Sequence, residues 1–73
     1  MIFDELKTMR KNLILLRNGK GWSIEEVSQQ SEIDTKTLKE MENGKDFEVA
    51  LLWRLCRVYR IKPHEVFLPI GRT

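Results

Sequence analysis

Cysteine is almost missing from this 73-residue chain, which contains only Cys56. A single cysteine excludes an internal disulfide framework and favours a reducing compartment. Long hydrophobic runs are missing too, since stretches such as Leu13 to Leu16 are far too short to cross a membrane. The N-terminus lacks the cleavage pattern of a signal peptide. These shortages predict a cytoplasmic protein with no membrane partner.

The residues that enzyme chemistry usually needs are equally scarce. Cys56 and His64 are single residues without visible nucleophile or metal-ligand partners, and the chain has neither a glycine-rich phosphate loop nor an H-x-x-x-H pattern. We therefore predict no enzyme, no metal, no cofactor and no small-molecule ligand. Cys56 is interpreted as a small core residue and His64 as a surface residue.

The size and charge of the chain fit one small domain over residues 1–73. A chain of this length buries only about 60% of the surface that it exposes when unfolded, so the core is thin. Thirteen basic and eleven acidic residues give a net charge of +2. This balance permits a polyanionic partner without requiring one.

Breaks at Gly19-Lys20-Gly21, Gly44 and Pro63 divide the chain into helices and predict an all-α fold. A first helix over about 4–17 places one hydrophobic stripe inward: Ile2, Leu6, Met9, Leu13 and Leu16. A later helix over about 47–59 is expected to bury Val49, Leu52, Leu55, Cys56 and Tyr59 and to expose Arg54 and Arg57. A short fifth helix is expected from Pro63, where proline is tolerated in a first turn.

Residues 23–45 predict two short helices joined by a tight turn. Ser23 and Glu26 have the spacing of a capping box, and Asp34 can cap a second helix about eleven residues later. Gly44 can then end that helix in the left-handed conformation. Hydrophobic staples are expected between Trp22 and Val27 and between Ile33 and Leu38. Helix, turn, capped helix and glycine stop together form a helix-turn-helix unit.

With these residues the chain resembles the lambda-repressor/Cro-like (XRE-type) family of DNA-binding domains. The resemblance covers about residues 5–68, leaves 69–73 as a tail, and is most family-like at Glu42-Asn43-Gly44-Lys45. It implies a five-helix, all-α domain with the helix-turn-helix at the second and third helices. It also implies an ion pair between Arg17 and Glu42. The alternative for Arg17 is an exposed position at a helix C-terminus, favoured by the helix dipole.

The third helix is the one expected to contact the bases of DNA. At 100° per residue its outward arc carries Lys36, Lys39, Glu40 and Asn43, with Thr35 at its N-terminal end. The first residues of such a helix enter the major groove and contact base edges. The predicted base-reading residues are therefore Thr35, Lys36, Lys39 and Glu40. The alternative is that these side chains form an ordinary solvated face.

Phosphate contacts are expected at helix N-termini and in the loop after the third helix. The predicted set is Ser23, Ile24, Thr37, Asn43, Gly44 and Lys45. Many relatives have glutamine in place of Ile24 and glycine in place of Glu32, so we expect Glu32 to adopt a positive φ at a cost of about 1 kcal/mol. Six acidic residues weaken phosphate attraction in this half: Glu25, Glu26, Glu32, Asp34, Glu40 and Glu42.

We interpret the chain as a sequence-specific regulator of transcription that binds double-stranded DNA, a repressor acting as a homodimer at a pseudo-palindromic operator. The alternative is a protein-interaction module that keeps the helix-turn-helix fold and binds DNA weakly or not at all. It would use exposed apolar groups, which could equally form the homodimer contact: Leu15, Leu51, Val58 and Leu68–Ile70.

Overall fold

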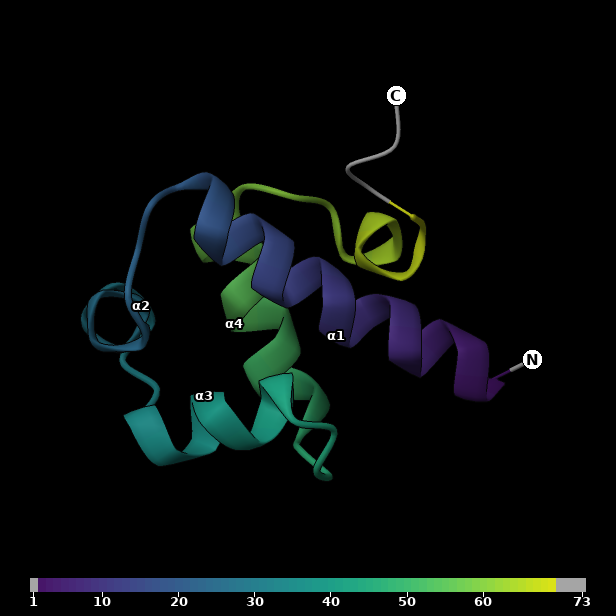
Figure 1. Cartoon of the computed structure of the whole chain (residues 1–73), viewed down its shortest axis with the longest axis horizontal. Helices are drawn as coiled ribbons and strands as arrows, with labels where there is room; N and C mark the ends of the chain where they lie inside the picture. Colours follow the sequence, from purple (N-terminus) through teal and green to yellow (C-terminus); the bar gives the residue numbers. More distant parts are fainter. Residues whose placement is uncertain (1, 70–73) are drawn as a thin grey trace.

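The computed structural model describes residues 2–69, with side chains from Glu5 onward. Figure 1 shows α1 running across the front of α4, with α2 seen end-on and α3 along the edge of the domain farthest from the C-terminus. The elements are α1 (Ile2–Gly19), α2 (Ile24–Ser31), α3 (Thr35–Glu42), α4 (Val49–Tyr59) and the 3₁₀ helix η1 (Pro63–Phe67). Within residues 2–69 there is no strand, so the all-α prediction is confirmed for this range.

The predicted count of five helices is not confirmed, because the last element is one short 3₁₀ helix. It spans Pro63–Phe67, and the N–H of Leu68 donates to the carbonyl oxygen of Glu65 at 3.1 Å, a bond three residues back. The Glu65 carboxylate accepts the N–H of Lys62 at 3.1 Å, which closes the start of the element. Helices of the 3₁₀ type are used in short pieces, and five residues are already at the long end of their range.

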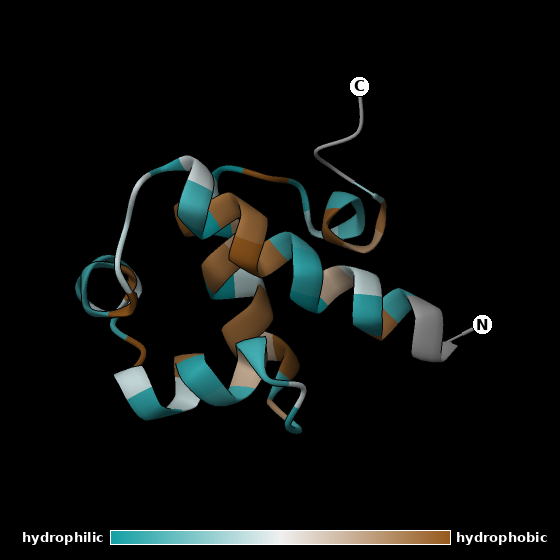
Figure 2. Cartoon of the chain, viewed as in Figure 1, coloured by the Kyte–Doolittle hydropathy of each residue, from teal (hydrophilic) through white to brown (hydrophobic). Residues whose placement is uncertain are grey.

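The hydrophobic core lies where α1 and α4 cross, and Figure 2 shows hydrophobic residues concentrated on these two helices while the rim of α2 and α3 is hydrophilic. The other elements close the core from their own sides, with Val27 from α2 and Val66 from η1. The buried hydrophobic residues are Met9, Leu13, Val27, Ile33, Leu38, Met41, Leu52, Leu55, Cys56, Tyr59 and Val66. Cys56 is thus a core residue, as predicted, and both residues of the Ile33–Leu38 staple are buried.

Two predicted core residues are exposed, and these predictions were wrong. Val49 is 57% exposed because α4 begins there, two residues later than expected, with Phe47 packing against the core from the preceding loop. Leu6 is 40% exposed. It lies on the first turns of α1, which project beyond the other helices in Figure 1. The side chain of Ile2 lies outside the described residues.

A buried side-chain amide, not predicted from the sequence, joins the middle of α1 to the C-terminal segment of the described chain. Asn12 is 1% exposed, and its Nδ2 donates to the carbonyl oxygens of Val66 and Leu68, both at 2.7 Å. These bonds satisfy two carbonyl groups that the short η1 leaves without helical partners. Asn12 therefore fixes η1 against the middle of α1.

Glu32 adopts the predicted positive φ, at 63°, in the left-handed region at the end of α2. We expect Glu32→Gly to stabilise the domain by up to about 1 kcal/mol, because glycine takes this conformation without a Cβ penalty. Thermal unfolding of the two proteins measures the effect. The matched control is Glu32→Gln, which removes the charge and keeps the strain, so a gain of equal size in the control would attribute the effect to charge.

Candidate nucleic-acid interface

The start of α2 is closed by the predicted capping box. The N–H of Glu26 donates to Oγ of Ser23 at 3.1 Å, and the N–H of Ser23 donates to Oε1 of Glu26 at 2.8 Å. Two of the backbone donors that a helix start leaves unpaired are thereby satisfied. The entry to the helix-turn-helix unit is therefore set by local chemistry.

Asp34 caps α3, also as predicted, and accepts two bonds from one residue. Its Oδ2 accepts the N–H of Thr37 at 3.2 Å, and its Oδ1 accepts the Thr37 hydroxyl at 2.7 Å. Both bonds lower the pKa of Asp34 below its ordinary value, and the bond from the Thr37 hydroxyl has the larger effect. Since the Thr37 hydroxyl has one hydrogen, a phosphate contact by Thr37 requires that this bond be exchanged.

The turn between α2 and α3 is held by a buried serine that the sequence analysis overlooked. Ser31 is 3% exposed; its hydroxyl donates to the Val27 carbonyl oxygen at 2.7 Å and accepts the N–H of Ile33 at 3.2 Å. Glu32, with its positive φ, lies between Ser31 and Ile33. Its own N–H donates to the Ser28 carbonyl oxygen at 2.8 Å. The angle between the two helices is thus supported from inside the domain.

Arg17 and Glu42 form a two-pronged ion pair between the end of α1 and the end of α3. Nε of Arg17 donates to Oε2 of Glu42 at 2.9 Å, and Nη2 donates to Oε1 at 3.1 Å. A third bond, from Nη1 to the carbonyl oxygen of Trp22 at 3.1 Å, reaches the loop before α2. The hydrogen bond to Glu42 raises the pKa of Arg17 against the opposing effect of burial. One guanidinium thereby connects three segments that support the helix-turn-helix unit.

Two aromatic rings stack near this ion pair, and one of them, that of Tyr59, is close enough to feel the charges of Arg17 and Glu42. The rings of Trp22 and Tyr59 stack with their centroids 6.2 Å apart, and Nζ of Lys20 lies 5.2 Å from the Trp22 ring. Burial, and then the charge of Glu42, raise the pKa of Tyr59 to about 12, although Arg17 opposes the shift.

This raised pKa predicts a loss of stability in alkali. An unfolded tyrosine loses its proton near pH 10, whereas Tyr59 in the folded domain keeps its proton up to about pH 12. The stabilisation is complete below about pH 10 and falls as the pH rises toward about 12, since the unfolded state then binds fewer protons. We expect urea unfolding midpoints to fall more steeply over this window in the natural protein than in Tyr59→Phe. Parallel pH profiles would contradict the assignment.

The loop after α3 has the predicted left-handed glycine, and a side chain from α1 lies on it. Gly44 has φ +90°, and the N–H of Lys45 donates to the Glu40 carbonyl oxygen at 2.9 Å, which ends the helix. A Cβ at residue 44 would overlap the guanidinium of Arg10. Arg10 and Lys45 also line one pocket of about 250 Å³. The place of Arg10 was not predictable from the sequence, because residues 34 positions apart along the chain meet here.

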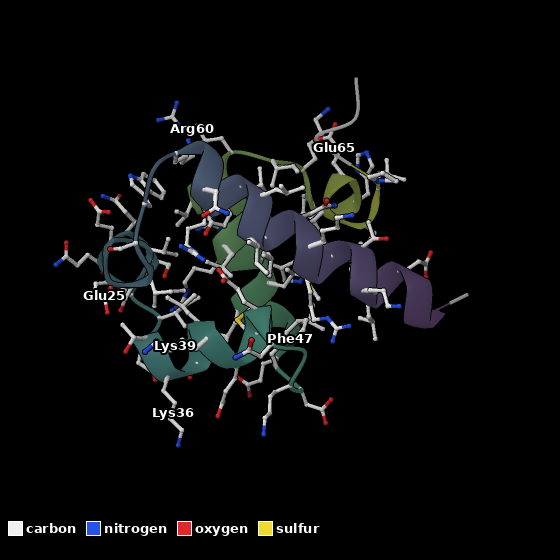
Figure 3. All side chains as sticks on the ribbon, in the orientation of Figure 1. Glu25, Lys36, Lys39, Phe47, Arg60 and Glu65 are labelled. Atoms are coloured by element: carbon white, nitrogen blue, oxygen red, sulfur yellow. The ribbon has the colours of Figure 1, made fainter. Side chains whose placement is uncertain are left out.

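The predicted base-reading residues lie on the outward side of α3. Lys36 and Lys39 are exposed, while Thr35 and Glu40 are partly exposed. Figure 3 shows Lys36 pointing from α3 away from the rest of the domain. The buried side of α3 is made by Leu38 and Met41. This face can therefore approach a duplex without disturbing the core.

Apart from Thr37, which lies within α3, the predicted phosphate-binding residues lie at the two ends of the helix-turn-helix unit. Ser23 precedes α2, and three more follow α3: Asn43, Gly44 and Lys45; all four are exposed. Ile24 differs, since its side chain is packed against the core, so it can offer only its backbone N–H. That N–H belongs to the first turn of α2, where backbone donors point out of the helix.

Charge is distributed very unevenly between this unit and the rest of the chain. Residues 23–48 contain eight acidic and three basic side chains, a net charge of −5, whereas the remaining residues contain ten basic and three acidic ones, a net charge of +7. The unit expected to face DNA is therefore acidic as a whole, and the three lysines Lys36, Lys39 and Lys45 supply all its positive charge.

Within residues 2–69, no helix has both the length and the hydrophobicity needed to span a bilayer. In the same part of the chain, no three histidine, cysteine or acidic side chains are grouped as metal ligands would be.

Comparison with known proteins gives one match. No curated protein and no solved structure matches the chain significantly. The sequence profile of the helix-turn-helix family matches residues 13–66, which is well over half of the chain and includes α2, the turn and α3. The chain therefore belongs to the Cro/C1-type (XRE) helix-turn-helix family of DNA-binding regulators.

Proposed function

We propose that the protein binds double-stranded DNA in a sequence-specific manner and represses transcription from a pseudo-palindromic operator. The observation that supports this best is the α2–turn–α3 unit, whose helices both start at side-chain caps and whose α3 presents Lys36 and Lys39 to solvent. Lysine can donate to O6 or N7 of guanine in the major groove. Thr35 and Glu40 complete the proposed reading set.

The proposed docking places the unit's two ends on the sugar–phosphate backbone. Ser23 and the first N–H groups of α2 meet one strand, and Asn43, Gly44 and Lys45 meet the other side of the groove. Phosphate contacts of this kind set the register and orientation of α3, whereas base contacts supply the sequence preference. The two roles are therefore assigned to different residues and can be separated by mutation.

We further propose that the protein acts as a homodimer. One domain of this size covers a single half-site, and two copies on a two-fold symmetric operator gain both affinity and specificity. Exposed apolar side chains are available for the contact between copies, since Leu15 is 39% and Leu68 is 54% exposed, and Leu51 and Val58 are partly exposed. Ile70, which completes the predicted patch, lies outside the described residues.

A protein-interaction module is the second candidate, and the charge of −5 on residues 23–48 favours it. Acidic side chains near the groove repel phosphates and lower non-specific affinity. The same exposed apolar side chains would then bind another protein. Under this alternative the fold is kept and α3 contacts no base.

Selection from random genomic fragments tests the proposal directly. Binding is measured at several salt concentrations, and bound fragments are enriched and sequenced. A two-fold symmetric motif, with affinity that falls as salt rises, is the expected result. The absence of binding even at low salt would reject the regulator and leave the interaction module.

The variant Glu40→Gln tests whether Glu40 contacts a base or repels phosphates, because the two roles predict opposite changes in DNA affinity. If Glu40 accepts a hydrogen bond from cytosine N4, Glu40→Gln weakens the preferred site and relaxes one base pair per half-site, with a loss of about 1–3 kcal/mol. We expect this result, measured by titrating the preferred and a mismatched operator. If Glu40 only repels phosphate, the variant binds every duplex more tightly, most strongly at low salt.

A further inference from the structure

The outward side of α4 carries a basic surface that the proposed function does not use. Residues of α4 that recur at helical spacing on this side are exposed: Ala50, Trp53, Arg54 and Arg57, followed by Arg60 just after the helix. Figure 3 shows Arg60 on the side of the domain opposite Lys36. The Arg60 end of this surface therefore lies away from a duplex docked on α3.

An indole ring and a shallow pocket lie within the basic surface. Trp53 is 46% exposed, which is unusual for so large an apolar side chain. The pocket beside it has a volume of about 500 Å³. One part of its lining is apolar, with Trp53, Cys56, Ile61 and Pro63, and the other is cationic, with Arg57, Arg60 and Lys62.

The cations of this surface are not neutralised by the domain itself. In the part of the chain with described side chains, the only ion pair joins Arg17 to Glu42. The nearest acidic residues along the chain are Glu48, just before α4, and Glu65, whose carboxylate accepts the backbone N–H of Lys62. Aromatic stacking and cation contacts in the described residues involve Trp22 and leave Trp53 without either.

We propose that this basic surface is a docking site for an acidic segment of a partner protein, in which carboxylates flank one apolar side chain. Carboxylates would pair with Arg57 and Lys62 through charge-assisted hydrogen bonds, and the apolar side chain would cover Trp53 and Pro63. A duplex matches this surface less well, because it presents phosphates outward and nothing that fills the apolar part of the pocket. The segment would bind while α3 remains free for DNA.

A fluorescent twelve-residue peptide with glutamates on both sides of a central leucine is a suitable probe. Fluorescence anisotropy measures its affinity for the full chain, and the indole N–H signals of the two tryptophans report the site, with Trp53→Phe to assign them. We expect the Trp53 signal to shift and the Trp22 signal to stay. Arg57→Gln combined with Lys62→Gln should weaken binding about tenfold.

Three controls make the result decisive. Lys7→Gln combined with Lys11→Gln removes the same charge from an exposed part of α1 and should leave the affinity within about twofold, since remote surface charges are screened. A peptide with glutamine in place of every glutamate should not bind. Equal losses in both double variants, an unshifted Trp53 signal, or tighter binding of twelve-nucleotide oligothymidylate at the same surface would each overturn the proposal.

Discussion

Arg17→Ala is expected to destabilise the domain by about 3 kcal/mol, because it leaves the Glu42 carboxylate mostly buried and without its partner. The side chains of Arg17 and Glu42 are only 19% and 13% exposed, so solvent compensates little of the loss. The carbonyl oxygen of Trp22 loses its bond from Arg17 as well. Since each kcal/mol shifts the melting temperature of a domain this small by about 4–8 °C, the midpoint should fall by more than about 10 °C.

Glu42→Ala provides the matched test of this explanation. If a stranded carboxylate is the main cost, the double variant Arg17→Ala with Glu42→Ala should be more stable than Arg17→Ala alone, because neither charge is left behind. Leu38→Ala, which truncates a residue 2% exposed on α3, calibrates the loss of an ordinary core contact at about 2–5 kcal/mol. Melting of Arg17→Ala and Leu38→Ala close to that of the natural protein would contradict the packing of α1 against α3.

Lys36→Ala and Lys45→Ala should weaken DNA binding in two different ways. Lys36 projects from α3 toward the proposed groove, so its loss should cost about 1–3 kcal/mol on the preferred site and little on other duplexes. Lys45 follows the glycine stop, where a phosphate contact is proposed. Its loss should weaken binding to all sequences similarly and lower the salt slope by about 1.

Titrations of preferred and scrambled operators at four or more salt concentrations separate these profiles. The control is Lys11→Ala, an exposed lysine on α1 that is not among the proposed DNA-binding residues. Sequence-independent losses of equal size for Lys36→Ala and Lys45→Ala would remove Lys36 from base reading. Full affinity in both variants would remove α3 from the interface altogether.

Features that depend on neighbouring residues were predictable from the sequence. The capping box at Ser23, the cap at Asp34 and the left-handed Gly44 all follow from residue types within three or four positions. The positive φ of Glu32 came instead from the family resemblance, because relatives have glycine there. The partner of Arg17 came from the family resemblance, since nothing local connects it with a residue 25 positions away.

Features that depend on distant segments were not predictable in this way. Asn12 lies on the buried side of α1, and only the position of η1, more than 50 residues later, gives its amide two acceptors. Arg10 meets Gly44 for the same reason. The periodicity of α4 assigned Val49 to the core, where it is in fact exposed. A hydrophobic pattern does not reveal whether another segment covers a given position of the helix.

The bonds from Asn12 also show that the folded unit extends at least to Leu68. The family profile ends at residue 66, yet one of the two acceptors of Asn12 is the carbonyl oxygen of Leu68. A chain cut after Val66 would keep the profile and lose that acceptor, leaving one donor of a buried amide without a partner. A cut after Val66, by a protease or at an engineered junction, therefore removes a part of the folded unit that the family profile does not include.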